Sequence, residues 1–248
     1  LVLLLLWGLP IATKADQAPQ LLGEKGILFW DQEQKLSGYP NIHKIFPSRL
    51  IKGTEEPSLL PKSGAALSDF SYSYKGKMLD ITDYFNQLNT TGLIVVKDKQ
   101  VVLEQYALGH SKEKTWISFS IAKSVVSMLF GAAIKDGYIN SVNDKATEYL
   151  PSLSGGAYNT VTIKDLLQMS SGVDWNEDYE DPNSDVASSP FRILQLLDYM
   201  DNLDSKSDPG KIFNYNTGET NLAGAVLRAA IGNNLSTYLH KKIWAPFG

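Results

Sequence analysis

Apolar residues follow two periods along the chain, a strand period in its first half and a helical period after it. Runs rich in β-branched residues at 91–97 and 100–106 flank Asp98-Lys99, which predicts a β-hairpin with a tight turn. Helical periodicity predicts helices at residues 80–88, 120–135, 162–172, 191–200 and 221–231. Strands that are followed by helices favour an α+β fold.

Local signals refine these elements. Thr162 and Asp165 have the spacing of a capping box, and Gly172 is expected to end the helix that they open. Residues 142–149 are read as a short turn or helix, and residues 175–190 as an acidic loop. Residues 23–62 carry scattered proline, glycine and aromatic residues, which predicts an irregular N-terminal extension. We expect it to be anchored on the main body by Trp30, Tyr39, Ile45, Phe46 and Ile51.

The first residues resemble part of a secretory leader. Leu1 to Ala12 is a short apolar run followed by small residues, so we expect cleavage near Ala15 or Ala18 and a secreted or periplasmic protein. A buried strand or helix is the alternative interpretation. The run is too short for a membrane span, and no stable span is expected.

Composition excludes several classes of function. The chain has 248 residues, a net charge of -4 and no basic run, which argues against a nucleic-acid partner. It has no cysteine, and His43, His110 and His240 lie too far apart for a metal-ligand spacing. We therefore expect neither a metal nor a cofactor, and the oligomeric state stays open.

Ser120 and Lys123 are the candidate reactive pair. They lie three residues apart at the start of an apolar helix, so their side chains share one face. A serine hydroxyl is a weak nucleophile until a neighbouring base takes its proton, and a lysine amine can be that base. The alternative is that Ser120 is only a helix N-cap and that Lys123 extends to solvent.

The order of motifs around this pair resembles the serine β-lactamase and penicillin-recognising superfamily. Ser120-Ile121-Ala122-Lys123 matches its nucleophile motif, and Thr162 to Val173 is similar to a segment that usually ends in Thr-Ser-Gly. Pro209 to Thr217 resembles the stretch that carries the second motif, Tyr-x-Asn or Tyr-x-Ser. The resemblance implies an antiparallel sheet flanked by helices, with a helical lobe.

Three further segments resemble the class C-like branch related to 6-aminohexanoate-oligomer hydrolases. These are Trp30 to Gln34, Phe46 to Arg49 and Asp174 to Pro182. The branch implies a serine hydrolase that cleaves linear amides or small esters through an acyl-enzyme. A β-lactamase or D,D-peptidase is the alternative within the superfamily, and a non-catalytic binding domain of the same fold is the alternative from another class.

The resemblance also implies roles for single residues. Ser120 is the nucleophile, and Lys123 and Tyr215 exchange protons with it, with the acylation base left open between them. Thr217 stands where the family more often has Asn or Ser, and Tyr179 resembles a loop tyrosine that closes over substrate. Both are therefore candidate substrate-binding residues.

The family's third motif normally follows the tyrosine motif at some distance along the chain. This sequence stops at Gly248 without it, so we expect the closing C-terminal strands and a second oxyanion donor to be missing from the chain. The expected division is a leader-like segment at 1–18, an N-terminal extension at 19–75 and the β-lactamase-related domain at 76–248.

Overall fold

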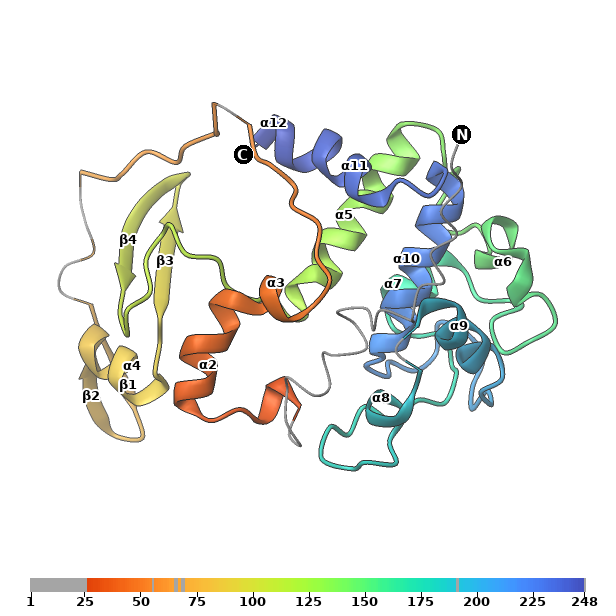
Figure 1. Cartoon of the computed structure of the whole chain (residues 1–248), viewed down its shortest axis with the longest axis horizontal. Helices are drawn as coiled ribbons and strands as arrows, with labels where there is room; N and C mark the ends of the chain where they lie inside the picture. The colour runs from red at the N-terminus through yellow and green to blue at the C-terminus, as the bar shows by residue number, and fades with distance from the viewer. Residues whose placement is uncertain (1–25, 55, 65–66, 68–69, 191, 248) are drawn as a thin grey trace, which may run out of the picture. The chain divides into compact units, whose positions relative to one another are not determined.

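The computed structural model describes residues 26–54, 56–64, 67, 70–190 and 192–247 (Figure 1). The described residues divide into two compact units. One contains the residues up to Leu50 and from Ser58 to Ile117, and the other contains Ile51–Pro57 and the residues from Ser118 onward. The leader-like segment at 1–18 lies outside the described residues, and the division expected from the sequence stays a prediction.

The first unit contains two antiparallel hairpins. Strands β3 (Gly92–Lys97) and β4 (Gln100–Tyr106) form the predicted hairpin, with Lys97 paired to Gln100. Asp98 and Lys99 have φ values of 50° and 62°, which is the backbone conformation of a tight hairpin turn. The second hairpin, which the sequence pattern did not predict, joins β1 and β2 at Ser71–Tyr74 and Lys77–Asp80.

Helix α4 (Ile81–Leu88) follows the second hairpin, as its periodicity predicts. Its N-cap Asp80 accepts from the backbone N–H of Asp83, whose carboxylate accepts from the N–H of Asp80. This reciprocal pair satisfies two N–H groups that the helix itself leaves free. Asn89 then ends the helix in the left-handed conformation.

The irregular structure expected for residues 23–62 is wrong for the first part of that segment. The residues from Ile27 to Ile45 fold into short helices, namely η1 (Ile27–Phe29), α2 (Gln32–Gly38), η2 (Tyr39–Asn41) and α3 (Ile42–Ile45). A capping box of Asp31 with Gln34 starts α2. Trp30 and Tyr39, two of the expected anchors, are buried and stack with ring centroids 5.7 Å apart.

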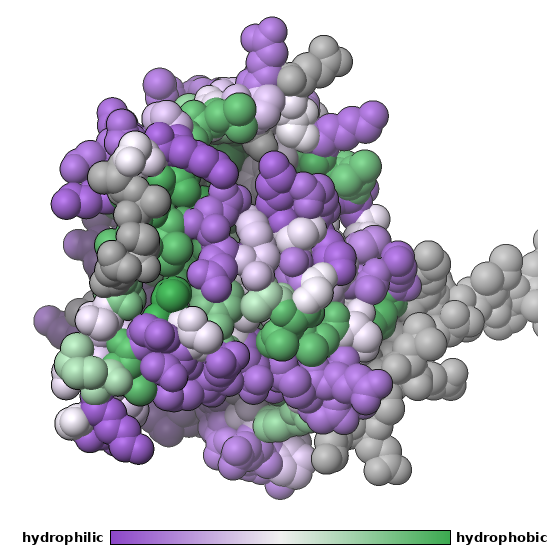
Figure 2. Space-filling model, turned by 90° about the vertical axis from the view of Figure 1, so that its left-hand side faces the viewer, coloured by the Kyte–Doolittle hydropathy of each residue, from purple (hydrophilic) through white to green (hydrophobic). Residues whose placement is uncertain are grey.

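Apolar side chains also reach the surface of the first unit. On β3, Ile94 and Val96 are exposed, whereas the intervening Leu93 and Val95 are partly buried, as the two-residue period of a strand requires. Figure 2 shows such apolar side chains at the surface between polar ones.

The second unit is helical, as the pattern predicts. Two helices of equal length form its centre, and shorter helices surround them. The helices are α5 (Ile121–Lys135), α6 (Ala146–Tyr149), η3 (Pro151–Leu153), α7 (Ile163–Leu167), α8 (Asp185–Ser188), α9 (Ile193–Asp201), α10 (Thr217–Ile231), α11 (Leu235–Leu239), the π-helical η4 (His240–Trp244) and α12 (Ala245–Phe247). Hairpins followed by helices make the α+β fold that the sequence favours.

The core of this unit lies where α10 contacts α5 and α7. Phe130 of α5 and Leu222 and Val226 of α10 are fully buried there. Burying one such side chain contributes about 1.5–3 kcal/mol, so the cluster fixes the two long helices against each other. The N-terminal ends of both helices carry the candidate site residues.

Two helix boundaries differ from the sequence prediction. Helix α7 ends at Leu167 rather than at Gly172, which lies in a later turn with φ 82°. Helix α10 begins at Thr217 rather than at 221, because the side chain of Asn216 accepts from Glu219 N at 2.9 Å and caps the helix there. The earlier start places the helix directly after Tyr215.

No helix within the described part of the chain is both long enough and apolar enough to cross a membrane.

Candidate active site

Ser120 lies at the N-cap of α5, on a turn with unusual backbone geometry. Phe119, directly before it, has φ 43°, a left-handed conformation that is uncommon for a bulky residue. The first turn of the helix closes directly after it, because Ala122 N donates to Phe119 O and Lys123 N donates to Ser120 O. Among the described residues, none accepts a hydrogen bond from Ser120 N–H, so this donor is available to an oxyanion.

Lys123 is held one turn further along α5, on the same face as Ser120. Its Nζ donates to Ser120 Oγ at 3.1 Å and lies 5.2 Å from the centroid of the Tyr215 ring. In its ammonium form, the side chain is attracted to the aromatic face at this distance. The ring and the hydroxyl therefore hold the amine beside the serine.

Tyr215 completes the group from the segment that precedes α10. Its hydroxyl donates to Ser120 Oγ at 2.9 Å, and the residue is 37% exposed. Ser120 Oγ thus contacts two groups that can exchange protons, and either one is within reach of the serine proton. The structure brings together the three residues that the sequence nominates for catalysis, and the choice of base between Lys123 and Tyr215 stays open.

The backbone on either side of Tyr215 is held by the loop that follows α7. Asn214 N donates to Met169 O at 2.9 Å, and Asn214 Nδ2 donates to Trp175 O at 3.0 Å. Trp175 is itself buried. On the other side, Asn216 N donates to Met169 Sδ at 3.5 Å, so the exposed tyrosine side chain extends from a backbone that is hydrogen-bonded before and after it.

Tyr179 and Thr217, the two candidate substrate-binding residues, both contact Glu177, which no motif in the sequence indicates. Their hydroxyl oxygens are 3.5 Å apart, and both hydroxyls donate to Glu177 Oε1, from Tyr179 at 2.8 Å. Burial raises the pKa of Tyr179, and the adjacent Glu177 carboxylate adds to that increase. The sequence around Glu177 is typical of a solvated acidic loop, and no pattern in it indicates this contact.

A second carboxyl group lies buried in the first turn of α10. Glu219 is 1% exposed, and its Oε1 accepts from the hydroxyl of Ser171. Its Oε2 is buried without a hydrogen-bond partner among the described residues. Burial raises the pKa of Glu219 to about 8, the Ser171 hydrogen bond opposes the increase, and the charge of Asp165 adds to it.

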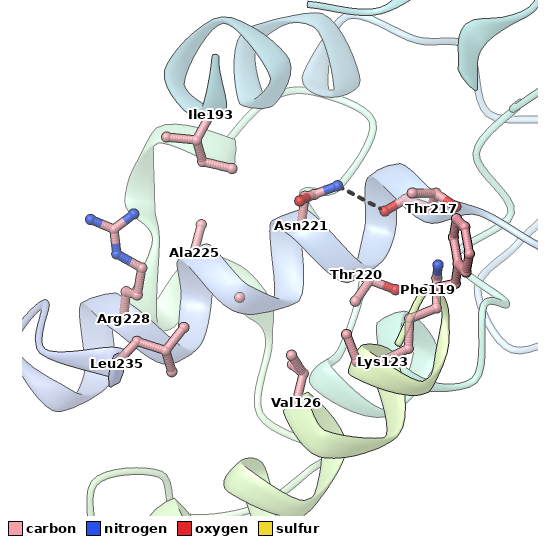
Figure 3. Close-up of a pocket in the computed structure, with 12 residues that line it drawn as sticks. Phe119, Lys123, Val126, Ile193, Thr217, Thr220, Asn221, Ala225, Arg228 and Leu235 are labelled. Carbon is pink, nitrogen blue, oxygen red and sulfur yellow. Dashed lines mark hydrogen bonds between the residues drawn. The ribbon is translucent and has the colours of Figure 1, made fainter. Parts of the chain in front are cut away.

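A cavity of about 440 Å³ opens beside the reactive group (Figure 3). Lys123, Phe119 and Thr217 line one part of it, and Arg228 and Leu235 lie further along α10 and beyond it. Its wall is largely apolar between these polar groups.

Within the described ranges, no group of three or more His, Cys, Asp or Glu residues could hold a metal ion.

Comparisons with known proteins relate this arrangement to a family. The Beta-lactamase family model matches residues 81–248. A 6-aminohexanoate-dimer hydrolase from Paenarthrobacter ureafaciens is 26% identical over 181 residues, which are 67% of this chain and 46% of that protein. The chain therefore spans about half the length of this curated relative.

Solved structures show the same fold. A "putative 6-aminohexanoate-dimer hydrolase" from Bacillus anthracis superposes with a TM-score of 0.74 at 18% identity, covering 95% of this chain and 62% of that one. A "putative beta-lactamase" from Bacteroides dorei DSM 17855 superposes with a TM-score of 0.55 at 23% identity, covering 67% and 49%. The family match confirms the resemblance seen in the motifs, and the chain belongs to the Beta-lactamase family.

Proposed function

We propose that this chain carries the nucleophile and the proton-transfer residues of a serine hydrolase that cleaves an amide or ester through an acyl-enzyme. One observation carries the proposal: Ser120 Oγ lies 3.1 Å from Lys123 Nζ and 2.9 Å from the Tyr215 hydroxyl. A weak nucleophile with two proton-exchanging neighbours is the arrangement that covalent catalysis requires.

The reaction follows from these contacts. Ser120 Oγ forms a bond to the substrate carbonyl carbon while its proton passes to Lys123 or Tyr215, and the carbonyl oxygen becomes an oxyanion. The backbone N–H of Ser120 and the N-terminal end of α5 stabilise that charge. Collapse of this tetrahedral oxyanion breaks the bond between the carbonyl carbon and the amine or alcohol. The departing amine or alcohol takes a proton from the same relay. Water then attacks the ester on Ser120 and releases the acid.

A β-lactamase or D,D-peptidase is the second candidate, because the family and the Ser-x-x-Lys pair fit it equally. The relation to a 6-aminohexanoate-dimer hydrolase and the apolar cavity beside Lys123 favour linear amides and esters. A non-catalytic binding domain has less support, since it would not require three reactive side chains in hydrogen-bond contact.

Intact-mass spectrometry with a panel of small esters, linear amides and penicillins tests the proposal. We expect a mass increase from an ester or amide acyl group on Ser120, with turnover. Stable acylation by penicillin alone would favour the D,D-peptidase candidate, and rapid penicillin turnover would favour the β-lactamase.

We also propose a secreted or periplasmic location, supported by the apolar run from Leu1 to Ala12. Cell fractionation and N-terminal sequencing of the mature protein test it. A protein that stays in the cytoplasm with this run attached would contradict it.

A further inference from the structure

Glu177 is the acceptor for four donors. Its Oε2 accepts from the backbone N–H of Thr217 at 2.9 Å and from the indole N–H of Trp175. Its Oε1 accepts from the hydroxyls of Tyr179, at 2.8 Å, and of Thr217. A carboxylate with two oxygens can accept all four hydrogen bonds, and hydrogen bonds to a charged acceptor are the stronger kind.

These contacts join the loop to Thr217, which lies two positions after Tyr215. Thr217 is the first residue of α10, so the carboxylate binds at the positive end of that helix. Tyr215 lies two residues earlier, and on its other side Asn214 Nδ2 is bound to Trp175 O. The loop at Trp175 and Glu177 therefore binds the side chain of Asn214 on one side of Tyr215 and the backbone N–H of Thr217 on the other.

The Tyr215 side chain is carried by the stretch of chain between these two hydrogen bonds. Tyr215 is 37% exposed, and its hydroxyl and ring contact Ser120 and Lys123, the groups with which it would exchange protons. Small displacements matter, because a 1 Å misplacement of a reacting group can lower a rate by about 100-fold.

We propose that Glu177 is a positioning residue that sets the place of Tyr215 over Ser120 by holding the N–H of Thr217 and, with it, the start of α10. The inference rests on the proposed function, since it assigns Glu177 a role in the same proton relay. The carboxylate does not touch the reacting atoms and acts through the backbone.

The four donors are of two kinds, and this allows a graded set of variants. The N–H groups of Thr217 and Trp175 can only donate, whereas the hydroxyls of Tyr179 and Thr217 can also accept. The side-chain amide of Glu177→Gln can therefore accept from both N–H groups with its oxygen and donate to both hydroxyls with its NH₂. Glu177→Ala leaves both N–H donors without an acceptor.

A second pair of variants tests the contact from the other side. Thr217→Pro removes the N–H at the first helical position, where proline is favoured, and Asn216 before it has the extended conformation that proline requires. Thr217→Ala removes the hydroxyl and keeps the N–H. The comparison of the two isolates the hydrogen bond from Thr217 N to Glu177.

Pre-steady-state acylation of the full-length protein by a p-nitrophenyl ester is the measurement. The burst amplitude counts competent sites, and the burst rate constant reports positioning in each of them. We expect Glu177→Ala and Thr217→Pro to lower the rate constant about 10- to 100-fold with the amplitude kept. Glu177→Gln should stay within about threefold of the parent, because its amide replaces the hydrogen bonds of the carboxylate. Thr217→Ala, which loses only the hydroxyl, should lower the rate constant by less than Thr217→Pro does.

Glu180→Ala is the matched control, because Glu180 is an exposed acid of the same loop whose side chain makes no hydrogen bond to a described residue. An unchanged rate constant in Glu177→Ala, or a loss confined to the amplitude, would overturn the inference. So would a Thr217→Pro variant that behaves like Thr217→Ala. A parent protein without any Ser120-dependent burst would instead contradict the proposed function itself.

Discussion

The Tyr215 hydroxyl donates a 2.9 Å hydrogen bond to Ser120 Oγ, although 95 positions of sequence separate the two residues. Ser120 is the residue at the N-cap position of α5, Tyr215 directly precedes the N-cap residue of α10, and these two helices pack together in the core of their unit. The buried faces of the helices therefore determine the distance between two exposed reactive groups.

Removing the Tyr215 hydroxyl tests its part in proton transfer. We expect Tyr215→Phe to lower the turnover number with an ester substrate at least ~100-fold, the scale of general acid–base catalysis, with little change in thermal stability. Tyr138→Phe is the control, since Tyr138 is an exposed tyrosine beyond the end of α5. A silent Tyr215→Phe would mean that the phenol has no chemical role.

Lys123 and Tyr215 should act as one relay. We expect Lys123→Ala to lower turnover at least ~100-fold alone, and the double variant with Tyr215→Phe to be little worse than either single one. Lys135→Ala, in the last turn of the same helix, controls for the loss of a charge from α5. If the two losses multiply, the residues act independently and the relay is wrong.

The buried Glu219 should make stability fall as pH rises. Its folded pKa, about 8, lies above the ordinary value of 4.5, so the folded state holds a proton that the unfolded state has released in that interval. The stabilisation is complete below about pH 4.5 and is lost as pH rises to about 8, at about 1.4 kcal/mol per pH unit.

Glu219→Gln removes this titration. In urea unfolding, the free energy of unfolding of the variant minus that of the parent should increase from pH 4.5 to about 8 and should be constant above that pH. Glu180→Gln, in the exposed loop, controls for the loss of one negative charge. A stability difference that does not change with pH would contradict the burial argument.

Gly172 should not tolerate a side chain. Its φ is 82°, and an added Cβ would lie 2.0 Å from the backbone oxygen of Ser207. We expect Gly172→Ala to lower the free energy of unfolding by more than ~1 kcal/mol. Gly131→Ala is the opposite control, because Gly131 lies in α5 with open space around it, and alanine there should stabilise by up to ~1 kcal/mol. Equal effects in thermal unfolding would contradict the assignment of the clash.

The parts of the site that local patterns encode could be predicted from the sequence. Ser120 and Lys123 share a helix face by spacing alone, and the hairpin at Asp98-Lys99 follows from β-branched runs around a turn. Tyr215 could be nominated only by the motif around it, since its contact with Ser120 depends on the packing of α5 against α10.

Other features depend on contacts that no local pattern records. Glu177 lies in a run of acidic residues typical of a solvated loop, and only the fold brings Thr217 to it, 40 positions later. The helix start at Thr217 was predicted four residues late because α10 begins with polar residues, and the cap formed by Asn216 outweighs their weak periodicity.

Labelling with a fluorophosphonate probe, followed by peptide mapping, tests the central claim most directly. The probe reports an activated serine whatever the natural substrate is. The parent protein should carry one label, on Ser120, and Ser120→Ala should carry none. A label that persists in Ser120→Ala, or a parent protein that the probe does not modify, would contradict the assignment of Ser120 as the nucleophile.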